Sequence, residues 1–105
     1  MTNRTRKSFE LDDHTASDVA ELFRALSDTS RIKLMAALVD GETNVGKLAA
    51  AVGISESAVS HHMRNLRQLR MVRARKEGRQ VFYSLEDQHI VDLFLRGVAH
   101  IQSGD

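Results

Sequence analysis

The chain has 105 residues, a formal net charge of +1, and neither cysteine nor proline. This length is typical of one domain, and 42% apolar with 28% charged residues indicates a folded chain. The lack of cysteine excludes disulfide frameworks, thiolate metal sites and thiol redox switches. The sequence has no apolar stretch typical of a membrane span or a secretory signal, so we expect a cytoplasmic protein without a membrane partner.

The charges are distributed unevenly along the chain. Seven arginines or lysines and a single acid lie between His61 and Gln80, whereas the last twenty residues carry four acids and one arginine. A basic segment of this kind is typical of a surface that faces phosphate groups. We therefore expect a partner that carries phosphate groups, and the helix-turn-helix unit described next indicates that this partner is double-stranded DNA.

The N-terminal part is predicted to contain a polar arm and two helices. Residues 1–14 form the arm, and residues 15–105 form the folded domain. In 17–26 the apolar residues recur at i, i+3, i+4 and i+7, which predicts a helix with Ser17 as its N-cap. A second helix is predicted over 30–39, before an Asp-Gly pair that ends it.

The middle of the chain predicts a helix-turn-helix unit followed by a hairpin. A short helix over 45–52, Gly53, and a longer helix over 55–69 have the spacing of that unit. Apolar and polar residues then alternate in 71–74 and 80–85, on either side of a basic turn that contains glycine. This order of elements is the winged form of the helix-turn-helix.

The last predicted helix, 88–102, is apolar over most of its circumference. So wide an apolar surface on a terminal helix indicates burial on two sides. The predicted fold is therefore mainly α with a β-hairpin wing, a winged helix-turn-helix that dimerises through its terminal helices.

The predicted helix 55–69 has an apolar face for the core and a polar face with small hydroxyls, which allow close approach to base edges and phosphates. Arginines and a lysine on this helix and the wing can neutralise phosphate. His62 lies beside the apolar face, and we expect it to pack there. An alternative is that the serines are helix caps and the charges an ordinary solvated face. The candidate DNA-binding residues are Glu56, Ser57, Ser60, His61, Arg64, Arg67, Arg75, Lys76 and Arg79.

Several segments between residues 19 and 100 resemble the ArsR/SmtB family of metal-sensing repressors. The resemblance implies a homodimer that binds a palindromic operator and releases it when an inducer binds. It also places Glu56, Ser57, Ser60 and His61 where the family reads DNA. The segments that carry the resemblance are 21–35, Leu48-Ala49, 53–62, with its Ser-x-x-His pattern, and 78–85, with its Gly-Arg-x-x-x-Tyr pattern.

The last helix also carries candidate metal ligands. Asp87 and His89 lie at its start, and His100 follows eleven residues after His89 on the same face, to within about 20°. The two histidines are about 16 Å apart along the axis, so they cannot chelate one ion within one chain. Antiparallel pairing of this helix with its copy would create two equivalent sites. Imidazole with carboxylate suits zinc, and also cobalt or nickel.

The zinc-sensing branch of the family keeps its ligands at these positions, which supports the metal hypothesis. Its usual fourth ligand corresponds to Ser103, a poor zinc ligand, so Asp105, brought near by a bend at Gly104, or water is expected instead. An alternative is that Asp87 caps the helix and His89 and His100 are interface residues.

These features together predict a homodimeric repressor that a divalent metal, zinc before cobalt or nickel, releases from its operator. The first alternative is a winged-helix repressor that is constitutive or controlled by another ligand. An enzyme is not expected, because Ser60 and His61 point about 100° apart on a helix and no acid orients the histidine. A dimeric interaction module without a DNA role is a further alternative.

Overall fold

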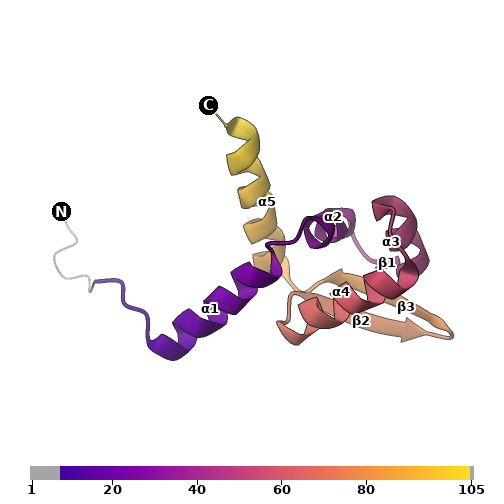
Figure 1. Cartoon of the computed structure of the whole chain (residues 1–105), viewed down its shortest axis with the longest axis horizontal. Helices are drawn as coiled ribbons and strands as arrows, with labels where there is room; N and C mark the ends of the chain where they lie inside the picture. Colours follow the sequence, from indigo (N-terminus) through magenta and orange to yellow (C-terminus); the bar gives the residue numbers. More distant parts are fainter. Residues whose placement is uncertain (1–7, 105) are drawn as a thin grey trace.

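The computed structural model describes residues 8–104, which form five helices and three strands (Figure 1). In chain order the elements are α1 (Asp13–Ala25), α2 (Thr29–Leu38), β1 (Thr43–Asn44), α3 (Val45–Val52), α4 (Glu56–Gln68), β2 (Val72–Glu77), β3 (Gln80–Leu85) and α5 (Gln88–Ser103). None of these helices combines the length and apolar character that crossing a membrane requires.

Every helix begins at a short polar side chain that accepts a hydrogen bond from a backbone N–H three residues later. Such caps satisfy one of the free N–H groups at a helix start. Donor and acceptor are 2.7 to 3.1 Å apart at the five caps, which are Asp12, Asp28, Asn44, Ser55 and Asp87. Gly53, in the left-handed conformation with φ +79°, ends α3 and lets the chain turn into α4.

Helix α1 begins four residues earlier than the sequence predicts. Asp12 is its N-cap rather than Ser17, so the last residues of the predicted arm are helical. The apolar periodicity starts only at Val19, because the first two turns are exposed and have no face to bury. Helix propensity and the cap therefore set this boundary, and an apolar pattern could not reveal it.

The wing is longer than predicted and belongs to a three-stranded antiparallel sheet of order β1-β3-β2. Strands β2 and β3 pair from Val72 opposite Leu85 to Glu77 opposite Gln80, around a two-residue turn that begins with Gly78 at φ +60°. Strand β1, where Thr43 pairs with Tyr83, is absent from the sequence prediction. Two residues are too few to show an alternating pattern.

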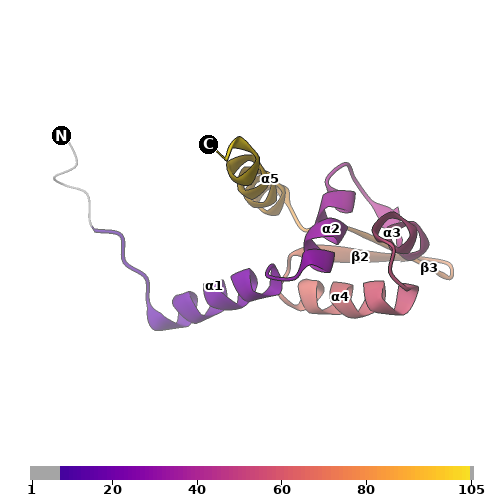
Figure 2. The same ribbon diagram turned by 45° about the horizontal axis from the view of Figure 1, so that its top comes forward.

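The core lies between α2, α3, α4 and the sheet, which gather into one body while α1 extends away from it (Figure 2). Its largest fully buried side chains are Leu34, Met35, Leu38, Leu48, Val59, Met63, Leu66, Met71 and Val72. The two terminal helices add only Ala25 and Phe94 to the buried set. The mainly α winged helix-turn-helix predicted from the sequence is confirmed.

Candidate nucleic-acid interface and metal site

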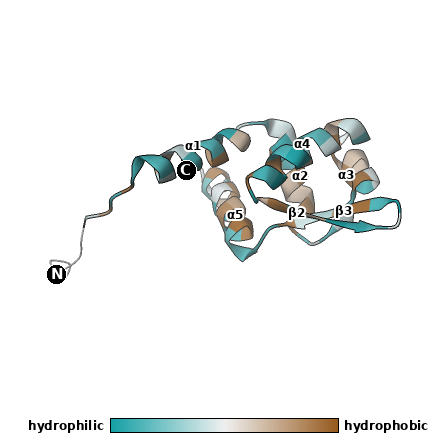
Figure 3. Cartoon of the chain, turned by 90° about the horizontal axis from the view of Figure 1, so that it is seen from below, coloured by the Kyte–Doolittle hydropathy of each residue, from teal (hydrophilic) through white to brown (hydrophobic). Residues whose placement is uncertain are grey.

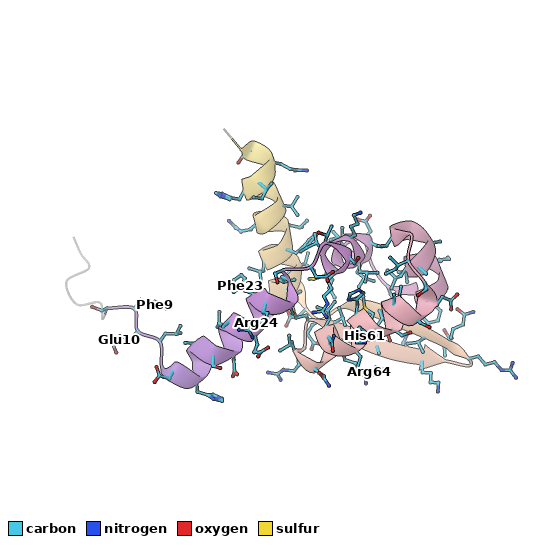
Figure 4. All side chains as sticks on the ribbon, in the orientation of Figure 1. Phe9, Glu10, Phe23, Arg24, His61 and Arg64 are labelled. Carbon is cyan, nitrogen blue, oxygen red and sulfur yellow. The ribbon has the colours of Figure 1, made fainter. Side chains whose placement is uncertain are left out.

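The polar face of α4 is an open hollow of about 410 Å³. The opposite face of the helix buries Val59, Met63 and Leu66 and so fixes its orientation. Figure 4 shows His61 and Arg64 on the outer side of α4, away from the core. The hollow is lined by five of the predicted DNA-binding residues, namely Glu56, Ser57, Ser60, His61 and Arg64.

A second hollow continues this polar surface to the base of the wing. It shares Glu56 and Ser60 with the first and reaches Arg79 and Gln80 on the wing. The Asn44 amide donates a hydrogen bond of 3.3 Å to the Gln80 side-chain oxygen across it. The predicted helix residues and the wing residue Arg79 therefore belong to one continuous polar surface.

The predicted DNA-binding arginines and lysine differ in their surroundings. Four of them are exposed and make no ion pair with any acid in residues 8–104: Arg64, Arg67, Lys76 and Arg79. Side chains of this kind are free to approach phosphate groups.

Arg75, by contrast, is held by two carboxylates. Its guanidinium donates to both oxygens of Glu42, at 2.9 and 2.8 Å, and to Glu77 at 3.1 Å. Its Cζ also lies 4.7 Å from the centre of the Phe82 ring. The hydrogen bonds raise the pKa of Arg75, and the same bond from Arg75 lowers the pKa of Glu42. Arg75 therefore connects the wing to Glu42, the residue before β1, and we call these contacts the Arg75 brace. The sequence did not predict the contact with Glu42, because the two residues are 33 positions apart.

His62 lies on the side of α4 that faces α2, in agreement with its predicted packing role. Its Nδ1 accepts a hydrogen bond of 3.0 Å from Nε of Arg31, and both side chains are partly buried. The neighbouring His61 ring is edge-on to the His62 ring at 6.0 Å. The two adjacent histidines therefore face different surroundings: His61 lines the polar hollow, and His62 makes a partly buried contact with Arg31 of α2.

Two of the predicted metal ligands lie together at the start of α5. Asp87 Oδ1 accepts from the Ile90 N–H at 3.1 Å and lies 3.7 Å from Nδ1 of His89, whose side chain is 96% exposed. The Ile90 hydrogen bond, together with the nearby His89, lowers the pKa of Asp87. The alternative role of Asp87 as a helix cap is thus observed. The second carboxylate oxygen of Asp87 makes no hydrogen bond to residues 8–104. Asp87 can therefore cap the helix through Oδ1 and bind a metal through its other oxygen.

The other predicted ligands do not join this pair within one chain. His100 is exposed, eleven residues along α5, and Asp105 lies outside the described residues. The Ser103 hydroxyl donates to the His100 carbonyl at 3.0 Å. No group of three potential ligands occurs within residues 8–104. Carboxylate and exposed imidazole at the start of α5 are chemically suited to half of a zinc site, and the other half requires a second chain.

An apolar groove of about 480 Å³ runs between α5 and the end of α1. Apolar residues recur along α5 in Figure 3, and Phe94 of this helix is buried in the core. Figure 4 shows Phe23 on the part of α1 nearest to α5. Several of these side chains are exposed, including Phe23 at 55% and Ile101 at 76%. The groove residues are Phe23, Leu26, Ile32, Leu93, Phe94, Gly97, Val98, Ile101 and Gln102.

Comparison with known proteins gives consistent matches. The family model described as "Bacterial regulatory protein, arsR family" matches residues 28–74. The chain is 49% identical to the transcriptional repressor SmtB homolog of Synechocystis sp. over 90 residues, which are 86% of this chain and 68% of that protein. It is 39% identical to the HTH-type transcriptional regulator NmtR of Mycobacterium tuberculosis over 100 residues, 95% and 83% of the two chains.

The fold matches as well. The crystal structure of the AntR antimony-specific transcriptional repressor superposes with a TM-score of 0.81 at 28% identity, covering 98% of this chain and 95% of that one. The expectation of a regulator and not an enzyme is thereby confirmed. The chain belongs to the arsR family of bacterial regulatory proteins and is a DNA-binding transcriptional repressor of this metal-sensing family.

Proposed function

We propose that this chain is a homodimeric repressor that binds a palindromic operator through α4 and the wing and is released by a divalent metal, zinc first among them. The hollow on α4 is the observation that carries the DNA part of the proposal, because five polar side chains converge there without contributing to the core. Free cations on the helix and at the tip of the wing supply contacts to phosphate. A regulator of this kind acts where the DNA is, in the cytoplasm.

The dimer is supported by the apolar side chains that the terminal helices leave exposed. Val19 and Phe23 on α1, and Leu93, Leu95 and Ile101 on α5, are 38% to 76% exposed. Phe23, Leu93 and Ile101 line one apolar groove, and exposed apolar surface of this kind is typical of a protein interface. If a second copy covers it across a two-fold axis, the two recognition helices are related by the same axis and read a palindrome.

The metal part rests on the donor set of α5. Asp87 and His89 of one protomer would hold the ion together with the partner's His100, and Asp105 or water would complete the set. Bound zinc would supply a crosslink between the two α5 helices. Cobalt or nickel would suit the same donors. The crosslinked α5 helices would then hold the two α4 helices at a separation that fits successive major grooves poorly. Because coupling is reciprocal, the factor by which zinc lowers DNA affinity must equal the factor by which DNA lowers zinc affinity.

The second candidate is a repressor that metal does not regulate. The observation that favours it is the cap made by Asp87, which explains this residue without an ion. In that case His89 and His100 would contribute only to the dimer interface.

A zinc titration against a fluorescent duplex tests the proposal, with the duplex selected by the wild-type protein from random sequences. We expect tight binding without zinc, steep weakening with salt, and release as zinc saturates one site per protomer. His89→Ala and His100→Ala should bind the duplex and no longer respond to zinc. His14→Ala, which removes an exposed histidine of α1, is the matched control.

The outcomes separate the parts of the proposal. Binding without any zinc response would refute the metal part and leave the repressor. Weak binding that salt does not change would refute the DNA-binding part.

A further inference from the structure

We propose that Arg31 and His62 are a positioning pair that holds the recognition helix α4 against the end of α1, and that the pair operates only while His62 is uncharged. DNA affinity is then lost in mild acid through this pair. The inference rests on the proposed use of α4 as the recognition helix, and it does not depend on the metal.

The Arg31 side chain connects three helices. It extends from α2, where Nε donates to Nδ1 of His62 on α4 at 3.0 Å. The NH1 group of the same guanidinium donates to the carbonyl of Ala25, the last residue of α1, at 3.3 Å. Both hydrogen bonds are partly buried, where a charged donor contributes more than it does in water. Arg31 therefore fixes how α1, α2 and α4 sit relative to one another.

The pair lies between the two surfaces that the repressor uses. His62 is followed one turn later by the buried Leu66 and preceded by His61, which lines the polar hollow. On the other side, Leu26 follows Ala25 and lines the apolar groove between α1 and α5. A shift of α4 relative to α1 would move the hollow relative to the dimer surface, and the Arg31 hydrogen bonds resist that shift.

The hydrogen bond requires a particular form of His62. A ring nitrogen that accepts carries no proton, so Nδ1 is bare and the proton of the neutral ring lies on Nε2. In the imidazolium form both nitrogens are donors, and Nδ1–H would face a guanidinium that is always charged. Protonation of His62 therefore abolishes the bond and places two cations side by side.

The other charged groups around His62 do not replace the lost acceptor. Asp28, at the start of α2, lies near the pair, but its carboxylate accepts from the Arg31 backbone N–H at 3.1 Å, and that bond lowers the pKa of Asp28. On α1, Glu21 is paired with Arg24 at 2.9 Å. On α4, His61 is the titratable neighbour. Among residues 8–104, His62 is the α4 residue whose side chain accepts from Arg31, although Asn65 and Gln68 of α4 line the same hollow as Arg31.

Substitution of His62 by asparagine and alanine tests the pair. In His62→Asn the amide oxygen takes the position of Nδ1, so an acceptor that does not titrate replaces the imidazole. In His62→Ala the acceptor is lost. Affinity for the duplex selected by the wild-type protein is measured by fluorescence anisotropy at about pH 8 and about pH 5.5, on either side of the usual range of histidine.

We expect about tenfold weaker binding for His62→Ala at the higher pH, which is the effect of losing one hydrogen bond to a charged group. Between the higher and the lower pH, the wild type should lose about tenfold more DNA affinity than His62→Asn does. His61 is present in both proteins, so its contribution cancels in that comparison. His14→Asn, an exposed histidine of α1, is the control and should follow the wild type.

Two further measurements separate positioning from a general loss of stability. Nitrogen-15 NMR of the imidazoles should show the Nε2–H tautomer for His62 at the higher pH. Circular dichroism should show each variant folded at the temperature of the binding assay. An Nδ1–H tautomer, or equal pH dependence in the wild type and His62→Asn, would overturn the pair. Failure of the wild type to bind any duplex would instead refute the proposed function.

Discussion

The α2–α4 body and the terminal helices bury their apolar side chains to very different extents. In the body, Leu34, Leu48 and Leu66 are completely buried. On the terminal helices, Phe23 is 55% and Ile101 is 76% exposed, although both line the same groove. The body thus has a complete core within one chain, whereas α1 and α5 carry apolar surface that a single chain does not cover.

This difference indicates that the two regions have different roles. A body with its own core can hold the polar hollow of α4 in a fixed shape whatever the state of the dimer. Terminal helices whose packing depends on a partner can adopt more than one arrangement, as a sensor requires. The Arg31 hydrogen bonds to His62 and Ala25 connect the two regions.

The largest effect is expected from a core leucine of the body. Leu66→Ala removes a fully buried side chain of α4 and leaves a cavity. We expect the free energy of unfolding to fall by about 2–5 kcal/mol, measured by chemical denaturation of the protein. A loss below about 1 kcal/mol would show that the body is packed more loosely than its burial indicates.

The same change on a terminal helix is expected to act on the dimer. Leu93→Ala alters a groove residue that is 38% exposed. We expect its effect to appear as about 1–2 kcal/mol of dimerisation free energy per substituted side chain, seen as a raised dissociation constant in sedimentation at several concentrations. An unchanged dissociation constant would remove α5 from the interface.

The sequence predicted the features that depend on local spacing, both in the body and in α5, whose predicted range 88–102 differs from the observed one by one residue. The spacing of Glu56, Ser57, Ser60, His61 and Arg64 predicts one polar helix face, because local periodicity alone decides which side chains meet there. Gly53 and Ser55 likewise predict the turn between α3 and α4. Such features depend on neighbours close in sequence.

Features that depend on distant neighbours could not be predicted. The bond between Arg31 and His62 joins positions 31 apart, and the brace between Arg75 and Glu42 joins positions 33 apart. No periodic pattern relates such pairs. The metal hypothesis needs a second chain, so neither the spacing of His89 and His100 nor the fold of one protomer tests it.

The role of Arg75 can be decided by a pair of substitutions in the wing. If Arg75 is a brace, Arg75→Ala and Glu42→Ala both remove the hydrogen bonds between Arg75 and Glu42, and both should weaken DNA binding by roughly two- to fivefold. If Arg75 contacts phosphate, Glu42→Ala removes one of its two carboxylate partners and should strengthen binding. Arg64→Ala is the reference for a phosphate contact, with an expected fall of about 1 in the salt dependence of log K. Weaker binding in both variants, without a change in salt dependence, would show that Arg75 acts as the brace.

The smallest effect on stability is expected from exchanging matched helix caps in the two regions. Asp28→Asn in the body and Asp87→Asn on α5 keep a capping oxygen and remove the charge. The pKa of each aspartate is lowered in the folded protein, chiefly by its backbone hydrogen bond, so its contribution is present above the unfolded value and lost as the pH falls through the folded one.

Both variants should therefore lose less stability than the wild type as the pH falls below about 4, in denaturation followed by circular dichroism. At neutral pH the two variants should differ in one respect, because a neutral amide is a poorer zinc ligand than a carboxylate. Asp87→Asn should bind zinc more weakly, and Asp28→Asn should bind it as the wild type does. Equal zinc affinity in both variants would assign Asp87 to the cap alone and leave the terminal helices with a dimer surface but no metal site at that position.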